Sequence, residues 1–327
     1  MVDLSTRYMG LELSNPLIVA SSSLVRSLEG VRQCAAAGAG AIVLKSLFEE
    51  QIEAETKELE EGSWLPGHTE AREYVRKMGM ALGPRGYLKL IEEAKKAVSV
   101  PIIASLNCVS PKWWTDYAKQ IAGAGADGLE LNIAVMPSDP QRSSKEIEGL
   151  YLNIFEKVNR RIGIPIAVKI GPYFTSMARM AWELCRRGAA ALVLFNRFYQ
   201  FDIDIERLAL APGYGFSAPE RMNLPLRWIA LLAGRVSCDL AASTGIHYGA
   251  GVIKQLLAGA SAVQVCSTLY INGIEQIGRI LDEVRAWMNQ HGFDSIDQIQ
   301  GKLSQMQSDK PELYERLQYI EALVGPD

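Results

Sequence analysis

The chain has 327 residues, of which 48% are apolar and 22% are charged, and it carries a net charge of −3 at neutral pH. This composition is that of a globular enzyme, and the small negative charge argues against nucleic acid or a membrane surface as a partner. No segment approaches the roughly 18 apolar residues of a membrane span, and residues 1–7 lack the basic-then-apolar pattern of a signal peptide. We therefore expect one domain over residues 1–327 and a cytoplasmic location.

The five cysteines and three histidines are scattered along the chain. The cysteines are odd in number and show no C-x-x-C spacing, which argues against a disulfide framework, a zinc site or an iron–sulfur cluster. The histidines are too few and too far apart to indicate a metal site. We expect no bound metal.

Short apolar runs alternate with stretches of helical spacing along the whole chain. The expected strands lie at residues 17–20, 41–44, 102–105, 128–131, 166–168, 190–195, 239–242 and 262–265. Several of the helical stretches end in a Gly-Ala pair, and glycine just past a helix supplies the left-handed residue that stops it. Eight strands that alternate with helices predict a parallel sheet closed into a (β/α)8 TIM barrel. A doubly wound open sheet is the alternative, although no G-x-G-x-x-G opens a helix.

Two connections, residues 46–86 and 197–224, are too long to be simple loops. Both leave the C-terminal ends of strands, the rim where barrel enzymes build their active sites. We expect the acidic run at residues 49–61 to form a solvated helix face. The polar C-terminal extension, about residues 293–327, is expected to pack on the barrel or on a partner chain.

Charged and polar side chains end three of the expected strands. Lys45 and Lys169 each follow an apolar run, and a charge at the end of a buried strand is costly unless something pairs with it. Glu130 and Asn132 share one face of the fourth strand, because side chains alternate along a strand, and that face should be the barrel interior. Glu130 either neutralises a lysine there or belongs to a binding site. Two lysines and Asn132 at strand tips favour a bound anionic or electron-poor ring, such as a flavin.

Small residues mark the ends of the last two expected strands, at residues 242–246 and 259–268. Loops in these positions of a barrel often hold a phosphate with backbone N–H groups and a helix N-terminus, and small residues let the phosphate approach. The pattern is shared by many barrels that bind no flavin.

Taken together, these segments resemble the dihydroorotate dehydrogenase family from Asn15 to about Gly292. The matching segments are Asn15–Ser21, Leu44-Lys45-Ser46, Glu130-Leu131-Asn132, Val168-Lys169, Thr244-Gly245-Ile246 and Gly259-Ala260-Ser261 with Gln264. The resemblance implies that FMN is the cofactor. It implies that Ala20 and Ser21 lie along the isoalloxazine, that Lys45, Asn132 and Lys169 bond its polar edge, that Asn196 lies near the ring, and that Thr244, Gly245, Cys266 and Ser267 hold the phosphate.

The chain departs from the family pattern around the substrate. The family has a cysteine or serine as the catalytic base in the loop after Asn132, where an ungapped match gives Val135 and a one-residue slip gives Met136. Neither side chain accepts a proton. In the family an asparagine binds the substrate ring, and the corresponding residue here is Arg76. Pro137 replaces the asparagine that follows the catalytic base.

Further departures lie beside the cofactor positions. Arg197 replaces a small hydroxyl residue after Asn196, Thr244 replaces one of two paired glycines, and Cys266 replaces another glycine.

Two hydroxyls are candidates for the missing base, Ser138 in the same loop and Tyr199 after the sixth strand; Ser143, Tyr173 and Cys108 are weaker ones. A general base must first lie within hydrogen-bond reach of the substrate. Arg76, Lys112 and Arg197 would give the mouth a positive charge suited to an anionic substrate. For each of these residues, the alternative is an ordinary surface or loop role.

The leading hypothesis is an FMN-dependent oxidoreductase of the dihydroorotate dehydrogenase type. It would oxidise dihydroorotate, a step of pyrimidine biosynthesis, or a related small ring, with catalytic roles for Lys169 and Asn132. A flavin-binding subunit that exchanges electrons with a redox partner protein is the second hypothesis. A phosphosugar lyase or isomerase barrel with a Schiff base at Lys169 is the third. The resemblance also makes a homodimer an expectation.

Overall fold

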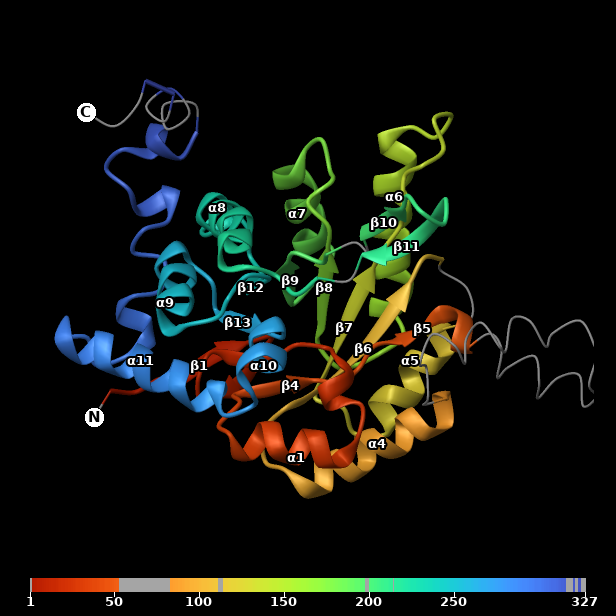
Figure 1. Ribbon diagram of the computed structural model, residues 1–327, viewed down its shortest axis with the longest axis horizontal. Coiled ribbons are helices and arrows are strands. Elements are labelled where there is room, and N and C mark those ends of the chain that lie inside the picture. The colour runs from red at the N-terminus through yellow and green to blue at the C-terminus, as the bar shows by residue number, and fades with distance from the viewer. Residues whose placement is uncertain are drawn as a thin grey trace, which may run out of the picture.

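The computed structural model describes residues 2–52, 83–110, 114–197, 200–213, 215–315, 320, 323 and 324. Its centre is a closed barrel of parallel strands (Figure 1). The barrel strands are β3 (Leu17–Val19), β4 (Ala41–Val43), β6 (Ile102–Cys108), β7 (Gly128–Ile133), β8 (Ile166–Ile170), β9 (Ala191–Leu194), β12 (Asp239–Ser243) and β13 (Ala262–Val265). They are joined in the order β4-β3-β13-β12-β9-β8-β7-β6, and pairing of β4 with β6 closes the ring. The predicted TIM barrel and the positions of its strands are confirmed.

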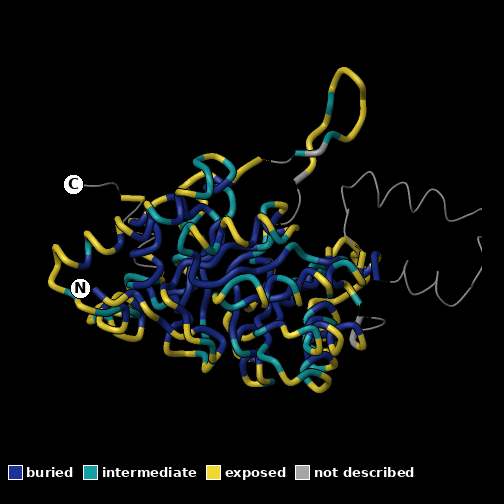
Figure 2. The backbone as a smooth tube through the Cα atoms, turned by 90° about the horizontal axis from the view of Figure 1, so that it is seen from below, coloured by how far each residue is buried: buried dark blue, intermediate teal, exposed yellow. Residues whose placement is uncertain are grey.

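Helices surround the barrel, as Figure 1 shows. They are α1 (Leu28–Ala36), α4 (Pro84–Ala97), α5 (Trp114–Gly123), α6 (Ser144–Asn159), α7 (Met177–Arg186), α8 (Asn223–Leu232), α9 (Gly249–Ala258), α10 (Ser267–Asn272) and α11 (Gln276–Gln290). The residues of each strand that face outward pack on the helices in one large apolar cluster, so that Leu129, Leu131 and Ile133 of β7 lie there. Figure 2 shows buried backbone concentrated at the centre of the molecule, under an exposed surface.

The inside of the barrel has an apolar lower half that is closed by an N-terminal hairpin. Strands β1 (Thr6–Tyr8) and β2 (Leu11–Leu13) pair antiparallel, with Met9 and Gly10 at positive φ in the turn. Tyr8, Met9 and Leu13 pack against the inward-facing side chains of the strands in a second apolar cluster. This hairpin was not predicted from the sequence.

The upper half of the interior is polar. One inward-facing position further along the strands, the apolar layer gives way to Ser105, Glu130, Lys169, Ser243 and Gln264, all of which are buried. The register of β7 and β8 pairs Asn132 with Lys169, so their side chains lie at the same height near the C-terminal rim. This arrangement follows from the alternation of side chains along a strand. It places charged and amide groups between the second apolar cluster and the mouth of the barrel.

The long rim connections contain secondary structure of their own. After β9, strands β10 (Gln200–Asp204) and β11 (Ala209–Gly213) form an antiparallel hairpin. After β4, the two-residue strand β5 (Leu47–Phe48) pairs with the end of β6. Glu49 then accepts hydrogen bonds from the backbone N–H groups of Val109 and Ser110, both at 2.9 Å, and is buried. The expectation of a solvated face was therefore wrong for Glu49, whose carboxylate caps backbone donors; residues 53–61 lie outside the described residues.

The described part of the C-terminal extension packs on the barrel helices. The N–H groups of Gly301 and Leu303 donate to Leu256 O and Leu257 O of α9, at 2.9 and 2.8 Å. Arg235 donates to Gln305 Oε1 at 2.9 Å. In the described residues, no helix is long and apolar enough to cross a membrane.

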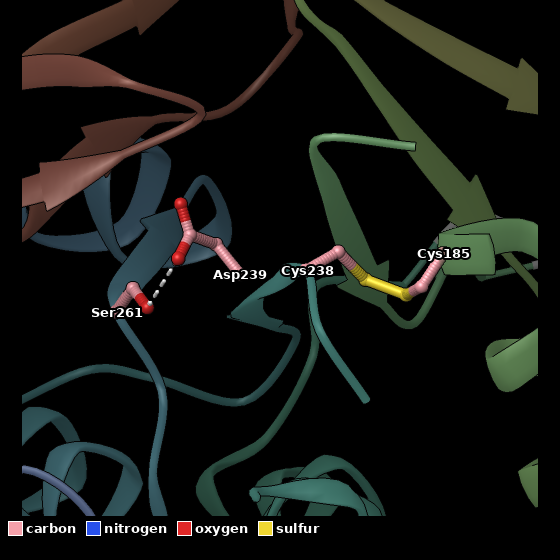
Figure 3. The surroundings of a disulfide bond; sticks show 4 residues. All are labelled: Cys185, Cys238, Asp239 and Ser261. Carbon is pink, nitrogen blue, oxygen red and sulfur yellow. Dashed lines mark hydrogen bonds between the residues drawn. A yellow bond between two sulfur atoms is a disulfide. The ribbon is translucent and has the colours of Figure 1, made fainter. Parts of the chain in front are cut away.

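Cys185 and Cys238 form a disulfide, shown in Figure 3. Cys185 lies in the last turn of α7 and Cys238 directly precedes β12, and their Cα atoms are 5.4 Å apart. The expectation of no disulfide framework was wrong for this pair of cysteines. Parallel pairing of β9 with β12 brings the two segments together across a separation of 53 residues, which no local spacing reveals.

Candidate active site

A cavity of about 200 Å³ opens at the C-terminal ends of β3, β8, β9, β12 and β13. All but two of the residues expected to bind the cofactor line it. They are Ala20, Ser21, Lys169, Asn196, Thr244, Gly245, Cys266 and Ser267. These residues come from five separate parts of the chain, and the fold brings them together around one cavity.

The remaining two expected residues, Asn132 and Lys45, lie beside the cavity. Asn196 Nδ2 donates to Asn132 Oδ1 at 2.8 Å, which joins the end of β9 to the end of β7. Lys45 is half-buried, with its Nζ 5.8 Å from the ring centre of Phe48. Burial lowers the pKa of Lys45, against the opposing effect of the Cys266 thiol. A lysine with this environment gains from an anionic ligand that would keep it charged.

Lys169 belongs to a buried network that crosses the barrel. Its Nζ donates to Gln264 Oε1 at 2.8 Å, and Gln264 Nε2 donates to Glu130 Oε2 at 2.5 Å. Lys169 Nζ and Glu130 Oε1 are 3.6 Å apart, an ion pair without a hydrogen bond. The ion pair between Glu130 and a lysine, one of the two roles expected for Glu130, is present. Gln264 bridges the two residues, and in the sequence it stood out only as part of the resemblance to the family.

The far end of the cavity is a cradle of small hydroxyl and backbone groups. Gly245 N–H donates to Ser217 Oγ at 3.1 Å, and Ser217 N–H and Oγ both donate to Ser267 Oγ, at 3.1 and 3.0 Å. Thr244 and Gly245 have φ values of +85° and +77°. Positive φ at two successive residues turns their backbone toward the cavity. It also explains why the family uses glycines here, since only glycine adopts this region without strain.

Ser217 lines the cavity and His247 supports it from behind, and neither residue was predicted from the sequence. Ser217 is 6% exposed, and its carbonyl lies 2.6 Å from His247 Nε2. This contact holds the rim connection against the loop that follows β12. Arg197 Nη2 donates to Gly215 O at 2.8 Å and so spans the same connection from the other side. No local sequence pattern indicated Ser217, because it reaches the cavity only when the connection after β9 folds back over the barrel.

Three hydroxyls link the tips of β3, β4 and β6 near the cavity. Ser46 N–H donates to Ser21 Oγ at 2.7 Å, and the Ser46 hydroxyl lies 2.9 Å from that of Ser21 and 2.8 Å from that of Ser105. Tyr87 OH in turn accepts from Ser105 N–H at 2.8 Å. This chain fixes the position of Ser21, which lines the cavity.

The loop after β7 places no proton acceptor at the position of the family base. Val135 is 8% exposed and lines a separate cavity with Tyr151 and Phe174, while Met136 is 60% exposed. Val135 N–H donates to Tyr151 OH at 3.3 Å. Ser138 is exposed and lies outside both cavity linings, and Tyr199, Lys112 and Arg76 lie outside the described residues.

The free thiols near the site are not bases at neutral pH. Burial raises the pKa of Cys266, although Lys169, Lys45 and Arg197 act in the opposite direction. Burial, Glu49 and Glu50 raise the pKa of Cys108 well above its ordinary value. Both therefore stay protonated. Cys108 is the inert buried thiol that the sequence analysis favoured.

Comparison with known proteins decides the family. A family model described as dihydroorotate dehydrogenase matches residues 3–288. The chain belongs to the dihydroorotate dehydrogenase family. Members of this family are flavin-dependent oxidoreductases, and the match spans the whole barrel.

Individual relatives agree with the family match at modest identity. The catalytic subunit of dihydroorotate dehydrogenase B (NAD(+)) from Thermoplasma acidophilum is 24% identical over 92% of this chain and 99% of its own length. The proteins of the same name from Pyrococcus abyssi and Methanothermobacter thermautotrophicus are each 26% identical, over 91% of this chain and 98% and 97% of their own lengths.

The residues present fit a flavin that carries a phosphate. Lys169 offers a buried cation at one end of the cavity, and Gly245 N–H, Ser217 and Ser267, which bond one another here, form a group of donors at the other end that a phosphate would engage. Among the described residues, no three His, Cys, Asp or Glu side chains are grouped to hold a metal ion.

Proposed function

We propose that this protein is an FMN-dependent oxidoreductase that oxidises dihydroorotate or a related small anionic ring. The observation that carries the proposal is the pairing, in one cavity, of the buried Lys169 ammonium with the cradle of Gly245, Ser217 and Ser267. A cation suits the electron-rich edge of a flavin, and clustered donors suit a phosphate. When bound, FMN would supply the hydride acceptor.

Each residue has a role that its position supports. Lys169 and Lys45 would hold the polar edge of the ring, where their positive charge suits the negative charge of a reduced flavin. Asn132 and Asn196, already joined by a hydrogen bond, present amide donors and acceptors where substrate and ring meet. Thr244, Gly245, Cys266 and Ser267 hold the phosphate through their backbone and hydroxyls. Ala20 and Ser21 lie along the ring.

The substrate is anionic in this proposal because the described cations around the mouth outnumber the anions that line it. Among the described residues, Lys169 and Arg197 line the cavity and no carboxylate does. The proton of the substrate passes to Ser138, in the loop after β7, or to Tyr199, in the connection after β9, because Val135 and Met136 cannot accept it. In the first case Ser138 must move into reach when substrate binds, because it lies outside the cavity lining.

A second candidate function follows from the missing base. Relatives are named as catalytic subunits, which implies that those proteins work with a partner. This chain could likewise pass electrons between its flavin and a redox partner without oxidising a small ring itself. We favour the oxidoreductase because the cavity keeps the polar groups that a ring substrate needs. A homodimer is compatible with either function.

The phosphosugar lyase or isomerase is the least supported reading. A Schiff base needs a neutral lysine amine as nucleophile. Lys169 is instead engaged by its neighbours: it donates to Gln264 Oε1 at 2.8 Å and forms an ion pair with Glu130 at 3.6 Å.

The test is flavin binding by the purified protein. We expect a yellow protein that, once stripped of flavin, rebinds FMN more tightly than riboflavin, because the Gly245 cradle contacts the phosphate. Ser217→Ala should narrow this preference, whereas Ser308→Ala, in the distant C-terminal extension, should leave it unchanged. A colourless protein that cannot be reconstituted with FMN would overturn the proposal.

A further inference from the structure

Glu130 lies directly behind Lys169 and does not touch the cavity. Lys169 and Gln264 line the cavity and Glu130 is absent from its lining. The carboxylate is 1% exposed, and its Oε1 has no hydrogen-bond partner among the described residues. An ionised group in this position is costly unless its charge does something that a neutral side chain could not.

The bonds of the network leave the ammonium of Lys169 available to a ligand. A lysine carries three N–H donors, and the described residues occupy one of them, through Gln264 Oε1 at 2.8 Å. Glu130 Oε1 lies 3.6 Å away, beyond hydrogen-bond distance. Gln264 thus stands between the two charges: it donates to Glu130 and accepts from Lys169. The bond to Gln264 orients the ammonium of Lys169 toward the cavity, and its other two N–H donors remain available to a ligand.

We propose that Glu130 is a positioning residue that sets the reduction potential of the bound flavin, by holding Lys169 through Gln264 and offsetting part of its positive charge. The inference rests on the proposed FMN site. Lys169 alone would favour the reduced, more negative flavin strongly. A carboxylate behind it, in a site screened from water, opposes that effect because Coulomb interactions are large at low dielectric. The potential therefore reflects both charges.

A hydrogen-bonding role alone does not account for Glu130. Glutamine in its place would have the same shape and could still accept from Gln264, but it would leave Lys169 without the negative partner that lies 3.6 Å away. The hydrogen bonds need an acceptor at Oε2, which an amide supplies equally well. What only the carboxylate supplies is its negative charge, a short distance behind the ammonium.

The experiment compares FMN-loaded wild type with Glu130→Gln. One readout is the flavin reduction potential, measured against a reference dye. The other is the dissociation constant for sulfite, which adds to oxidised flavins and bleaches the visible band. Removing the charge should tighten sulfite binding by about tenfold or more, from the size of a buried charge interaction at this range. The potential should become more positive by about 30 mV, the two-electron equivalent of tenfold.

Matched variants separate charge from shape. Glu130→Asp keeps the charge and should stay close to wild type in both readouts. Asp239→Asn removes a partly buried carboxylate at the start of β12, which accepts from Met9 N–H at 2.8 Å and from the Ser261 hydroxyl (Figure 3), and should change neither readout. Glu130→Met is a second neutral variant, to be measured where Glu130→Gln does not fold.

The outcomes distinguish this inference from the proposed function. If a neutral variant binds FMN but keeps the wild-type potential and sulfite affinity, the role assigned to Glu130 is overturned and the FMN site stands. If Glu130→Asp shifts as far as Glu130→Gln, geometry and not charge is responsible, which also overturns it. Failure of the wild-type protein to bind FMN would instead remove the proposed function.

Discussion

The side-chain amide of Asn196 donates to the amide oxygen of Asn132 across 2.8 Å, and this bond joins two strand ends at the edge of the cavity. The two asparagines come from the loop after β9 and from β7, 64 residues apart in the chain. Because each amide has one donor or acceptor satisfied by the other, their remaining polar atoms are oriented and available to a ring-shaped ligand.

Replacing either asparagine with alanine should weaken binding of the product orotate to the FMN-loaded protein by about five- to tenfold, the usual value of a lost hydrogen bond to a ligand. The double variant should lose less than the product of the two single effects, since both singles break the same bond. Orotate binding is measured from the perturbation of the flavin spectrum. Asn159→Ala, which removes a bond to Arg187 O far from the cavity, is the control and should have no effect. Fully multiplicative effects would show that the two amides act independently.

Gly245→Ala should abolish tight FMN binding and destabilise the protein by about 1–3 kcal/mol. Gly245 has φ +77°, and a Cβ there would lie 2.4 Å from Met222 N. The backbone must therefore shift, and with it the N–H that meets Ser217. Unfolding in denaturant and FMN titration measure the two effects. Gly149→Ala, in the middle of α6 with open space around it, should instead be neutral or slightly stabilising. Normal FMN affinity in Gly245→Ala would contradict the assigned cradle.

The barrel could be predicted from the sequence because its strands are short apolar runs at regular intervals, and their inward and outward faces follow from simple alternation. The same alternation correctly put Glu130 and Asn132 on the inner face of β7. Family resemblance then named most of the side chains that line the cavity.

What the sequence did not reveal depends on long-range folding. Ser217 reaches Gly245 only because the connection after β9 folds back over the rim, and Cys185 meets Cys238 only because β9 pairs with β12. Glu49 read as part of a charged helix face, yet it caps two backbone N–H groups at the end of β6. In each case the partner is distant in sequence, and residue type alone does not indicate it.

The affinity for FMN should depend on the charge of Lys45. Burial lowers the pKa of Lys45 below its ordinary 10.5, so in the flavin-free protein it loses its proton at a lower pH than in the unfolded chain. The free energy of unfolding of the flavin-free protein should therefore rise with pH between the lowered pKa and 10.5. FMN binds the charged form, so its affinity should fall with pH over the same interval.

Titrations of FMN across this pH range test the prediction for Lys45. Lys45→Met should bind FMN more weakly at neutral pH and should lose this part of the pH dependence. Lys45→Arg, which keeps its charge at every accessible pH, should show a flat affinity over the interval. Identical pH profiles for wild type and Lys45→Met would contradict the placement of Lys45 at the ring.

The disulfide should contribute to stability under oxidising conditions. Cys238→Ser should lower the free energy of unfolding by about 2–4 kcal/mol, as expected for a bridge that closes a loop of this length. In the presence of dithiothreitol, wild type and variant should unfold at the same denaturant concentration. The reduced wild type is therefore the control for effects of the substitution other than loss of the disulfide. If mass spectrometry of the unreduced protein finds both thiols free and the reductant leaves wild type unchanged, the bond does not form in solution.

An anaerobic titration of the FMN-loaded protein with dihydroorotate tests the central claim most directly. The flavin band is followed as substrate is added. We predict that the band bleaches and that orotate forms in equal amount, with Ser138 or Tyr199 as the base in place of the residue lost at Val135. A band that stays oxidised with dihydroorotate, yet bleaches with dithionite, would contradict the oxidoreductase proposal and favour an electron-transfer subunit.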